Sequence, residues 1–192
     1  MKQKIIFIGG MPGTGKTTLA YKLAIFYGID KVVSLDLLKT VWLQQYSCKE
    51  YPYLYTTTHE AYKLEALSPI DGYIKHCEQI TELLIPVING LSNEKILIVE
   101  GAQILPSVIK YFFAECCYIN LYANEKEELI SRYEMKSRIR DYPWIKNIDS
   151  IMEINNFIKQ LDEPFLSQVH LNTDFHLILE IIKENFNEHF LY

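Results

Sequence analysis

The sequence GMPGTGKT at residues 10–17 matches the pattern G-x-x-x-x-G-K-[ST] at every fixed position. Its glycines let backbone N–H groups turn inward and approach phosphate oxygens, because no Cβ atom blocks the approach. Lys16 can reach the β and γ phosphates of a nucleotide, and the Thr17 hydroxyl can bind magnesium. We therefore expect a phosphate-binding loop for ATP and Mg2+. Its predicted contact residues are Gly10, Met11, Pro12, Gly13, Thr14, Gly15, Lys16, Thr17 and Thr18.

The residues on either side of this loop have the character that a nucleotide-binding loop needs. Residues 4–8 form an apolar run typical of a buried strand, and residues 17–27 have a helical pattern that ends at Gly28. A helix that starts here points the positive end of its dipole at the bound phosphate. The alternative is a chance match in a glycine-rich turn, and the strand before the loop and the helix after it argue against that alternative.

Short apolar runs alternate with helical patterns along the rest of the chain. Further strands are predicted at residues 32–35, 95–99, 117–122 and 169–171. Near-continuous apolar strands separated by helices indicate a parallel sheet that is covered on both faces. The predicted fold class is therefore α/β: a three-layer P-loop NTPase sandwich with a five-stranded parallel sheet between helices. We expect one domain over residues 1–192, with an acceptor-binding insertion at about 37–67 and a lid at about 132–148.

Polar residues at three positions predict where helices begin. Ser68 followed by Pro69 is typical of an N-cap and a first helical residue. Ser150 with Glu153 has the spacing of a capping box, and Thr173 could cap the last helix.

The composition limits the partners and the cellular setting that we expect. The formal net charge is −5, which argues against a general nucleic-acid surface. No apolar run reaches the ~18 residues that a membrane span needs. The short apolar run near the N-terminus is interpreted as a strand rather than as a signal peptide. We therefore expect a cytoplasmic protein that binds no membrane and keeps its cysteines reduced, and we leave its oligomeric state open.

Two acidic residues follow predicted strands, at the edge where a parallel sheet binds its ligand. Asp36 could accept a proton from a substrate hydroxyl or hold magnesium through water; the alternative is an N-cap for a helix that begins at Leu37. Glu100 could bind magnesium, as a Walker B acid does, or could simply be exposed at a strand end. Gly101 directly after it suggests a close backbone approach, which favours a functional role for Glu100.

Basic residues cluster around a helix that is predicted to begin near Glu125. Arginine spreads its charge and makes paired hydrogen bonds to phosphate oxygens, so the cluster fits a lid that closes over a transferring phosphoryl group. The alternative is a solvated basic face that nearby glutamates balance. The cluster consists of Arg132, Lys136, Arg138 and Arg140, and its three arginines are predicted catalytic residues.

Tyrosine and threonine are concentrated at residues 51–59. Hydroxyl groups and aromatic rings suit a polar substrate pocket, and a packed loop is the equally weighted alternative. His59 is interpreted as a structural histidine or a helix cap rather than as a base.

Several of these segments together resemble the 2-phosphoglycerate kinase-like group of P-loop kinases. Lys39 stands where that family typically has arginine, and Gln103 stands where it tends to have histidine. The lid arginines and LNTD at residues 171–174 extend the resemblance. The segments that carry it are residues 8–20, VSLDLLK at 33–39, LYTTTHEA at 54–61 and IVEGAQILP at 98–106.

The resemblance implies ATP, magnesium, a five-stranded parallel core and phosphoryl transfer to a small hydroxylated acceptor. We expect a kinase in which an acceptor hydroxyl, on a small molecule similar to 2-phosphoglycerate, attacks the γ-phosphate in line. Asp36 would position or deprotonate the acceptor, while Lys16, magnesium and the lid arginines would neutralise the developing charge. Two alternatives stay open: a kinase for a larger acceptor, such as an antibiotic, a nucleotide sugar or a nucleic-acid end, and a nucleotide-dependent regulatory ATPase.

Overall fold

The protein is built on a sheet of five parallel strands in the order β2-β3-β1-β4-β5. It was analysed as a computed structural model that describes residues 3–110, 116–137, 143–163 and 165–186. In chain order the strands are β1 (Lys4–Gly9), β2 (Val32–Ser34), β3 (Ile96–Glu100), β4 (Cys116–Tyr122) and β5 (Leu166–His170). The predicted five-stranded parallel sheet is confirmed, and each predicted strand overlaps an observed one.

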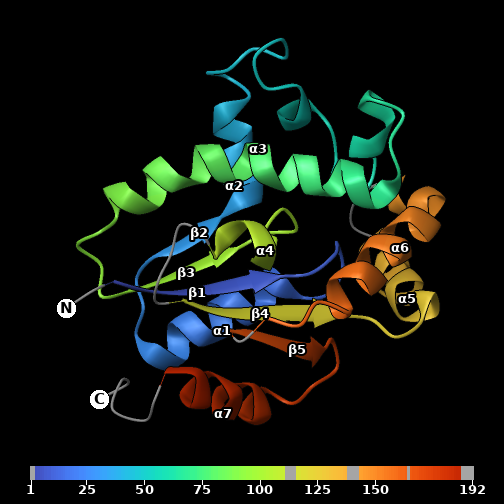
Figure 1. Cartoon of the computed structure of the whole chain (residues 1–192). Coiled ribbons are helices and arrows are strands. Elements are labelled where there is room, and N and C mark those ends of the chain that lie inside the picture. Colours follow the sequence, from blue (N-terminus) through green and yellow to red (C-terminus); the bar gives the residue numbers. More distant parts are fainter. Residues whose placement is uncertain (1–2, 111–115, 138–142, 164, 187–192) are drawn as a thin grey trace.

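Helices cover both faces of the sheet and its carboxyl edge. They are α1 (Lys16–Tyr27), α2 (Leu35–Trp42), α3 (Pro69–Gly90), α4 (Pro106–Ile109), α5 (Lys126–Ser137), α6 (Ile148–Lys159) and α7 (Phe175–Phe186). Short 3₁₀ turns lie at Pro52–Tyr55, Ala61–Leu64 and Pro143–Asn147. In Figure 1, α1 and α7 lie on one face, α3 and α4 lie on the other, and α5 and α6 lie beyond the ends of the strands. Among the residues described, no helix has both the length and the apolar character that crossing a membrane requires.

The central strand β1 shows why helices are needed on both faces. Ile5 and Phe7 belong to an apolar cluster that includes residues of α3. Ile6 and Ile8 point the opposite way and pack with residues of α1 and α7. Successive side chains of a strand alternate between the faces of a sheet, so a strand that is apolar at every position must be covered twice.

A third apolar cluster lies where α3, α5 and α6 meet, next to the phosphate-binding loop. It includes Met11 of that loop, Tyr73 of α3, Tyr133 of α5 and Ile154 of α6, and all four are fully buried. Interiors packed in this way resist small displacements of their side chains. The back of the phosphate-binding loop is therefore supported by three helices.

Two helix caps test the sequence predictions. The Ser68 hydroxyl oxygen accepts a hydrogen bond from the Asp71 amide at 3.1 Å, so the predicted cap of α3 is confirmed. Thr173 is wrong as the cap of the last helix, because the Asp174 carboxylate accepts from the His176 amide at 2.8 Å and the helix begins at Phe175. A carboxylate also interacts favourably with the positive end of the helix dipole.

Two other helices begin earlier than predicted. Helix α2 begins at Leu35, so Asp36 lies in the first turn of the helix rather than before it, and the N-cap alternative for this residue is wrong. Helix α6 begins at Ile148, so Ser150 lies inside its first turn rather than at its cap. Helix α2 follows β2 without an intervening loop, and the apolar pattern of the sequence does not mark such a boundary.

Candidate active site

The phosphate-binding loop at residues 10–17 joins β1 to α1. Three of its glycines have positive φ angles, of 128° at Gly10, 86° at Gly13 and 100° at Gly15. A Cβ atom at Gly13 would lie 2.5 Å from a ring carbon of Tyr133. Both the backbone conformation and the close packing therefore require glycine here, as the motif predicts.

The inside of this loop has the groups that a triphosphate needs. The Thr14 hydroxyl and the Lys16 ammonium group both donate hydrogen bonds to the Met11 carbonyl oxygen, at 2.9 Å and 3.2 Å. Lys16 is only 9% exposed, so its charge is held within the loop. Gly15 is the N-cap of α1 and offers no side-chain cap, which leaves the first amides of the helix for an anion. These residues fit the phosphates of ATP.

Glu100 is buried at the end of β3, beside the start of α1. Its exposed fraction is 2%, so the interpretation as an exposed acid is wrong. One carboxylate oxygen accepts a hydrogen bond from the Thr17 hydroxyl at 3.2 Å, and the other accepts from the Ser34 hydroxyl at 2.6 Å. A carboxylate next to a threonine hydroxyl is an oxygen donor set that fits Mg2+.

Ser34 is a site residue that sequence reasoning missed. It lies directly opposite Glu100 in the register of β2 with β3. Its position near the end of a predicted strand was a signal, but that signal points to Glu100 only when β2 and β3 are known to be neighbours.

A cavity of about 260 Å³ joins the phosphate-binding loop to the predicted acceptor segment. Lys16 and Thr17 line one part of it, and Asp36 of α2 lines another. The structure thus brings together residues that the sequence places in separate motifs. The other polar side chains around the acceptor part of the cavity are those of Lys39, Thr57, Thr58, His59 and Gln103.

Lys39 and Gln103 give the acceptor part of the cavity its chemical character. Lys39 donates a hydrogen bond to the Thr56 carbonyl oxygen. Burial lowers the pKa of Lys39, and the nearby Asp36 carboxylate opposes that shift. Gln103 is 5% exposed, and its side-chain oxygen has no hydrogen-bond partner among the residues described. A buried acceptor atom without a partner is costly, so a ligand that donates a hydrogen bond fits this position.

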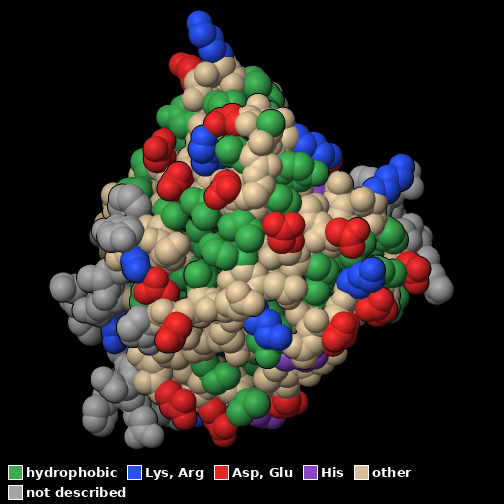
Figure 2. Space-filling view, turned by 45° about the vertical axis from the view of Figure 1, so that its right-hand side comes forward, with side chains coloured by type: hydrophobic (Ala, Val, Ile, Leu, Met, Phe, Trp, Pro, Cys, Tyr) green, Lys and Arg blue, Asp and Glu red, His purple; other side chains and the backbone are tan. Residues whose placement is uncertain are grey.

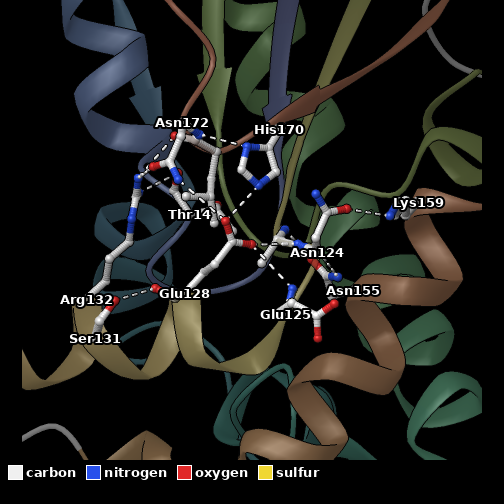
Figure 3. A network of polar contacts seen from close by, with 12 residues as sticks. Thr14, Asn124, Glu125, Glu128, Ser131, Arg132, Asn155, Lys159, His170 and Asn172 are labelled. Atoms are coloured by element: carbon white, nitrogen blue, oxygen red, sulfur yellow. Dashed lines mark hydrogen bonds and ion pairs between the residues drawn. The ribbon is translucent and has the colours of Figure 1, made fainter.

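Arg132 of α5 connects the phosphate-binding loop to the loop after β5 (Figure 3). Its Nη1 atom donates to the carbonyl oxygens of Gly13 at 3.2 Å and Thr14 at 3.1 Å. Its Nη2 atom donates to the Leu171 carbonyl oxygen at 3.1 Å and to the Asn172 side chain at 2.8 Å. These contacts are the ones expected of a side chain that holds two loops together.

Glu128 extends this network to the beginning of α5. One of its carboxylate oxygens accepts from the backbone amides of Asn124 at 2.7 Å and Glu125 at 3.3 Å. The other lies 2.8 Å from Nε2 of His170, at the end of β5. Figure 3 shows the Glu128 carboxylate between the histidine ring and these amides. The first turn of α5 is therefore tied to the sheet on the same side as Arg132.

The remaining predicted basic residues cannot be placed in the same way. Arg138 and Arg140 lie outside the described residues, as does part of the predicted lid. Tyr133 was missed by sequence reasoning: its hydroxyl donates to the Pro12 carbonyl oxygen at 2.6 Å while its ring packs under Gly13. A tyrosine on an apolar helix face gave no signal of that contact.

The face of the molecule seen in Figure 2 carries Lys and Arg side chains scattered among Asp and Glu side chains. Among the described residues of this face they do not gather into a basic surface, which a nucleic-acid backbone would need.

Comparison with known proteins adds to this geometry. No protein-family model matches the chain. A protein named 2-phosphoglycerate kinase from Methanococcus maripaludis strain C6 is 27% identical over 204 residues, which cover 95% of this chain. The chain resembles the 2-phosphoglycerate kinases. This resemblance confirms the one predicted from the sequence, and the chain spans about 65% of the length of that relative.

Solved structures of kinases share the fold. A gluconokinase from Sinorhizobium meliloti 1021 has a TM-score of 0.54 and 12% identity, with 97% of this chain and 93% of the other chain covered. The shikimate kinase from Acinetobacter baumannii has a TM-score of 0.52 and 16% identity, with 95% and 94% covered. The predicted P-loop kinase fold is therefore confirmed. The kinase names of these proteins agree with the prediction of a phosphotransferase.

Proposed function

We propose that the protein transfers the γ-phosphoryl group of ATP to a hydroxyl group of a small acidic metabolite similar to 2-phosphoglycerate. The observation that carries this proposal is that Lys16 of the phosphate-binding loop lines the same cavity as Asp36 and Lys39 of α2. A carboxylate suits an attacking hydroxyl, and an ammonium group suits an acidic group on the same molecule. The name of the curated relative supports this choice of acceptor.

The chain has residues for each part of the nucleotide. The backbone N–H groups of the phosphate-binding loop and the Lys16 ammonium group would hold the phosphates, and Thr17 and Glu100 would hold Mg2+. When bound, Mg2+ would neutralise charge on the β and γ phosphate oxygens. A second cavity, of about 240 Å³, lies between α1, Arg132 and the start of α7 and would receive the base.

Asp36 is exposed within the first cavity and would act on the acceptor. As the acceptor oxygen bonds to the γ-phosphorus, the bond from that phosphorus to the bridging oxygen of ADP breaks. The proton of the acceptor hydroxyl passes to the Asp36 carboxylate. Lys16 stabilises the charge that develops on the phosphates, because its ammonium group is already held at the loop.

The test is ATP consumption with 2-phosphoglycerate, with glycerol as a neutral acceptor, and with ATP alone. We expect slow hydrolysis of ATP alone and a large increase with the acid. Lys16→Ala should remove this turnover and weaken ATP binding, whereas Lys31→Ala, exposed just before β2, should leave both unchanged. Strong turnover of ATP alone that no acceptor increases would instead identify a regulatory ATPase. Stimulation only by large acceptors would point to the other alternative kinase.

A further inference from the structure

Two basic side chains from separate segments line the acceptor part of the first cavity, and a buried histidine lies close to both. Lys39 of α2 and His59 of the connection between the 3₁₀ turns line the cavity. His76 of α3 is fully buried and lies close enough to both of them to be affected by their charge. Helices α2 and α3 and the segment between them therefore contribute one basic group each to the same place.

His76 is unusual because neither of its ring nitrogens has a hydrogen-bond partner among the residues described. Polar atoms buried in a protein are nearly always paired, since removing them from water is costly. Burial, and then the charges of Lys39 and His59, lower the pKa of His76 to about 3. His76 is therefore a neutral ring at neutral pH, and it adds bulk to the cluster without adding charge.

His59 has charged groups around it on every packed segment. Lys39 of α2 and His76 of α3 interact electrostatically with it, and Asp36 of α2 lines the same cavity. Glu60 is its neighbour in the chain, and Lys63 belongs to the 3₁₀ turn that follows. Burial lowers the pKa of His59; Glu60 raises it, while Lys63 and Lys39 lower it further. His59 thus lies inside the cavity with its neutral form favoured, although a cavity for an acidic acceptor needs positive charge.

We propose that Lys39 and His59 together bind the acidic group of the acceptor, and that His59 takes up a proton from solvent when the acceptor binds. This inference rests on the proposed function, because it assumes an acidic acceptor. Lys39 offers a point charge and cannot make the paired contact that arginine makes. A protonated imidazole supplies the second donor that a carboxylate or phosphate group requires.

Charge balance explains why the proton arrives with the ligand. Without an anion, a protonated His59 would lie beside Lys39 in a buried site, which is unfavourable. An anion between the two groups favours the charged form of the imidazole and offsets its loss of water. His76 remains neutral throughout, so it does not compete with His59 for the proton.

The experiment is titration calorimetry of 2-phosphoglycerate into protein saturated with ADP and Mg2+, in two buffers of different ionisation enthalpy. The number of protons taken up should be larger for the wild type than for His59→Gln, by up to about one proton near neutral pH. The ligand's own titration contributes to both proteins, so the difference belongs to His59. His59→Gln should also weaken acceptor binding by about tenfold or more. Its affinity for ATP should be unchanged.

The pH dependence of the reaction gives a second test. The KM for the acceptor should rise with pH in the wild type, because the proton becomes harder to obtain. In His59→Gln that rise should be smaller, while kcat changes less. An equal rise in both proteins would overturn the inference.

The outcomes separate this inference from the proposed function. If acidic acceptors are phosphorylated but the two proteins take up equal numbers of protons, the inference is overturned and the kinase remains. If a neutral polyol is phosphorylated and acids are not, the inference is overturned as well. If ATP binds and no hydroxyl compound stimulates transfer, both fail.

Discussion

Two carboxylates near the phosphate-binding loop have opposite surroundings, and these surroundings separate their proposed roles. Asp36 is exposed within the first cavity, where a substrate hydroxyl can reach it. Glu100 is buried and accepts hydrogen bonds on both oxygens. A carboxylate that takes a proton must be accessible to the phosphoryl-accepting substrate. A carboxylate that binds a metal ion instead benefits from being held in place.

Asp36→Asn removes the proton acceptor while keeping the shape of the side chain. ATP affinity should be unchanged, and phosphoryl transfer should fall by about 100-fold. The loss of its charge near the start of α2 costs only about 0.3–1 kcal/mol, so the protein should stay folded. Asp30→Asn, exposed before β2, is the matched control. Equal transfer rates in the two variants, measured by coupled ADP release, would remove Asp36 from the mechanism.

Glu100→Gln should raise the Mg2+ concentration that half-maximal activity requires, by about tenfold or more, because the amide is a poorer metal ligand. Ser34→Ala should raise the Mg2+ requirement by less, since this change removes one hydrogen bond to Glu100 and leaves the carboxylate in place. Activity as a function of Mg2+ at saturating ATP measures both shifts. An unchanged requirement in Glu100→Gln would mean that the metal is held elsewhere.

Helix α5 supports the phosphate-binding loop, because its residues Arg132 and Tyr133 donate hydrogen bonds to carbonyl oxygens of that loop. A phosphate-binding loop presents its amides to the anion and its carbonyl groups outward, and these outward groups are the ones that α5 holds. The contacts of Arg132 therefore favour a positioning role over the catalytic role predicted from the sequence.

Arg132→Ala and Arg132→Lys distinguish these two roles. Lysine keeps the charge but cannot reach four oxygens on two loops, so it should fail to rescue the alanine variant. Both variants should weaken ATP binding by about tenfold, change kcat less, and speed hydrogen exchange at residues 10–15. A large fall in kcat with normal ATP affinity would show instead that Arg132 acts in the transition state, as the lid hypothesis predicts.

The sequence predicted the elements whose formation depends on local pattern. The strands were found because each contains a short apolar run, and the phosphate-binding loop was found because its glycines are needed for φ angles and packing. The acceptor part of the cavity could not be assembled in this way. Its connection is shaped by distant contacts: the Leu54 amide donates to the Gln79 side chain at 3.2 Å, and a Cβ on Gly72 would lie 2.3 Å from the Tyr62 nitrogen.

The molecule as a whole should lose stability in acid because it buries neutral histidines. The pKa of His76 is about 3 when folded, against about 6.5 when unfolded. Between these pH values the unfolded chain binds more protons than the folded one. The unfolding free energy is therefore unaffected by His76 protonation above pH 6.5 and decreases as the pH falls below that value. His76 alone should lower the unfolding free energy by about 1.4 kcal/mol per pH unit in this window.

Urea unfolding at several pH values checks this slope. His76→Leu should flatten it by about that amount, whatever its effect on stability at neutral pH. The exposed His176→Leu is the matched control and should leave the slope unchanged. Identical slopes in the wild type and His76→Leu would mean that His76 is protonated in the folded protein.

The strand order has a consequence for how the chain is made. Strand β1 leaves the ribosome before the other strands of this sheet, yet its two neighbours, β3 and β4, begin only at Ile96 and Cys116. Parallel pairing over such a separation forms slowly, and unpaired apolar strands are prone to aggregate. Until β3 and β4 have been synthesised, β1 and the phosphate-binding loop therefore have no neighbouring strands to pair with. That interval is when a chaperone would have an apolar strand to bind.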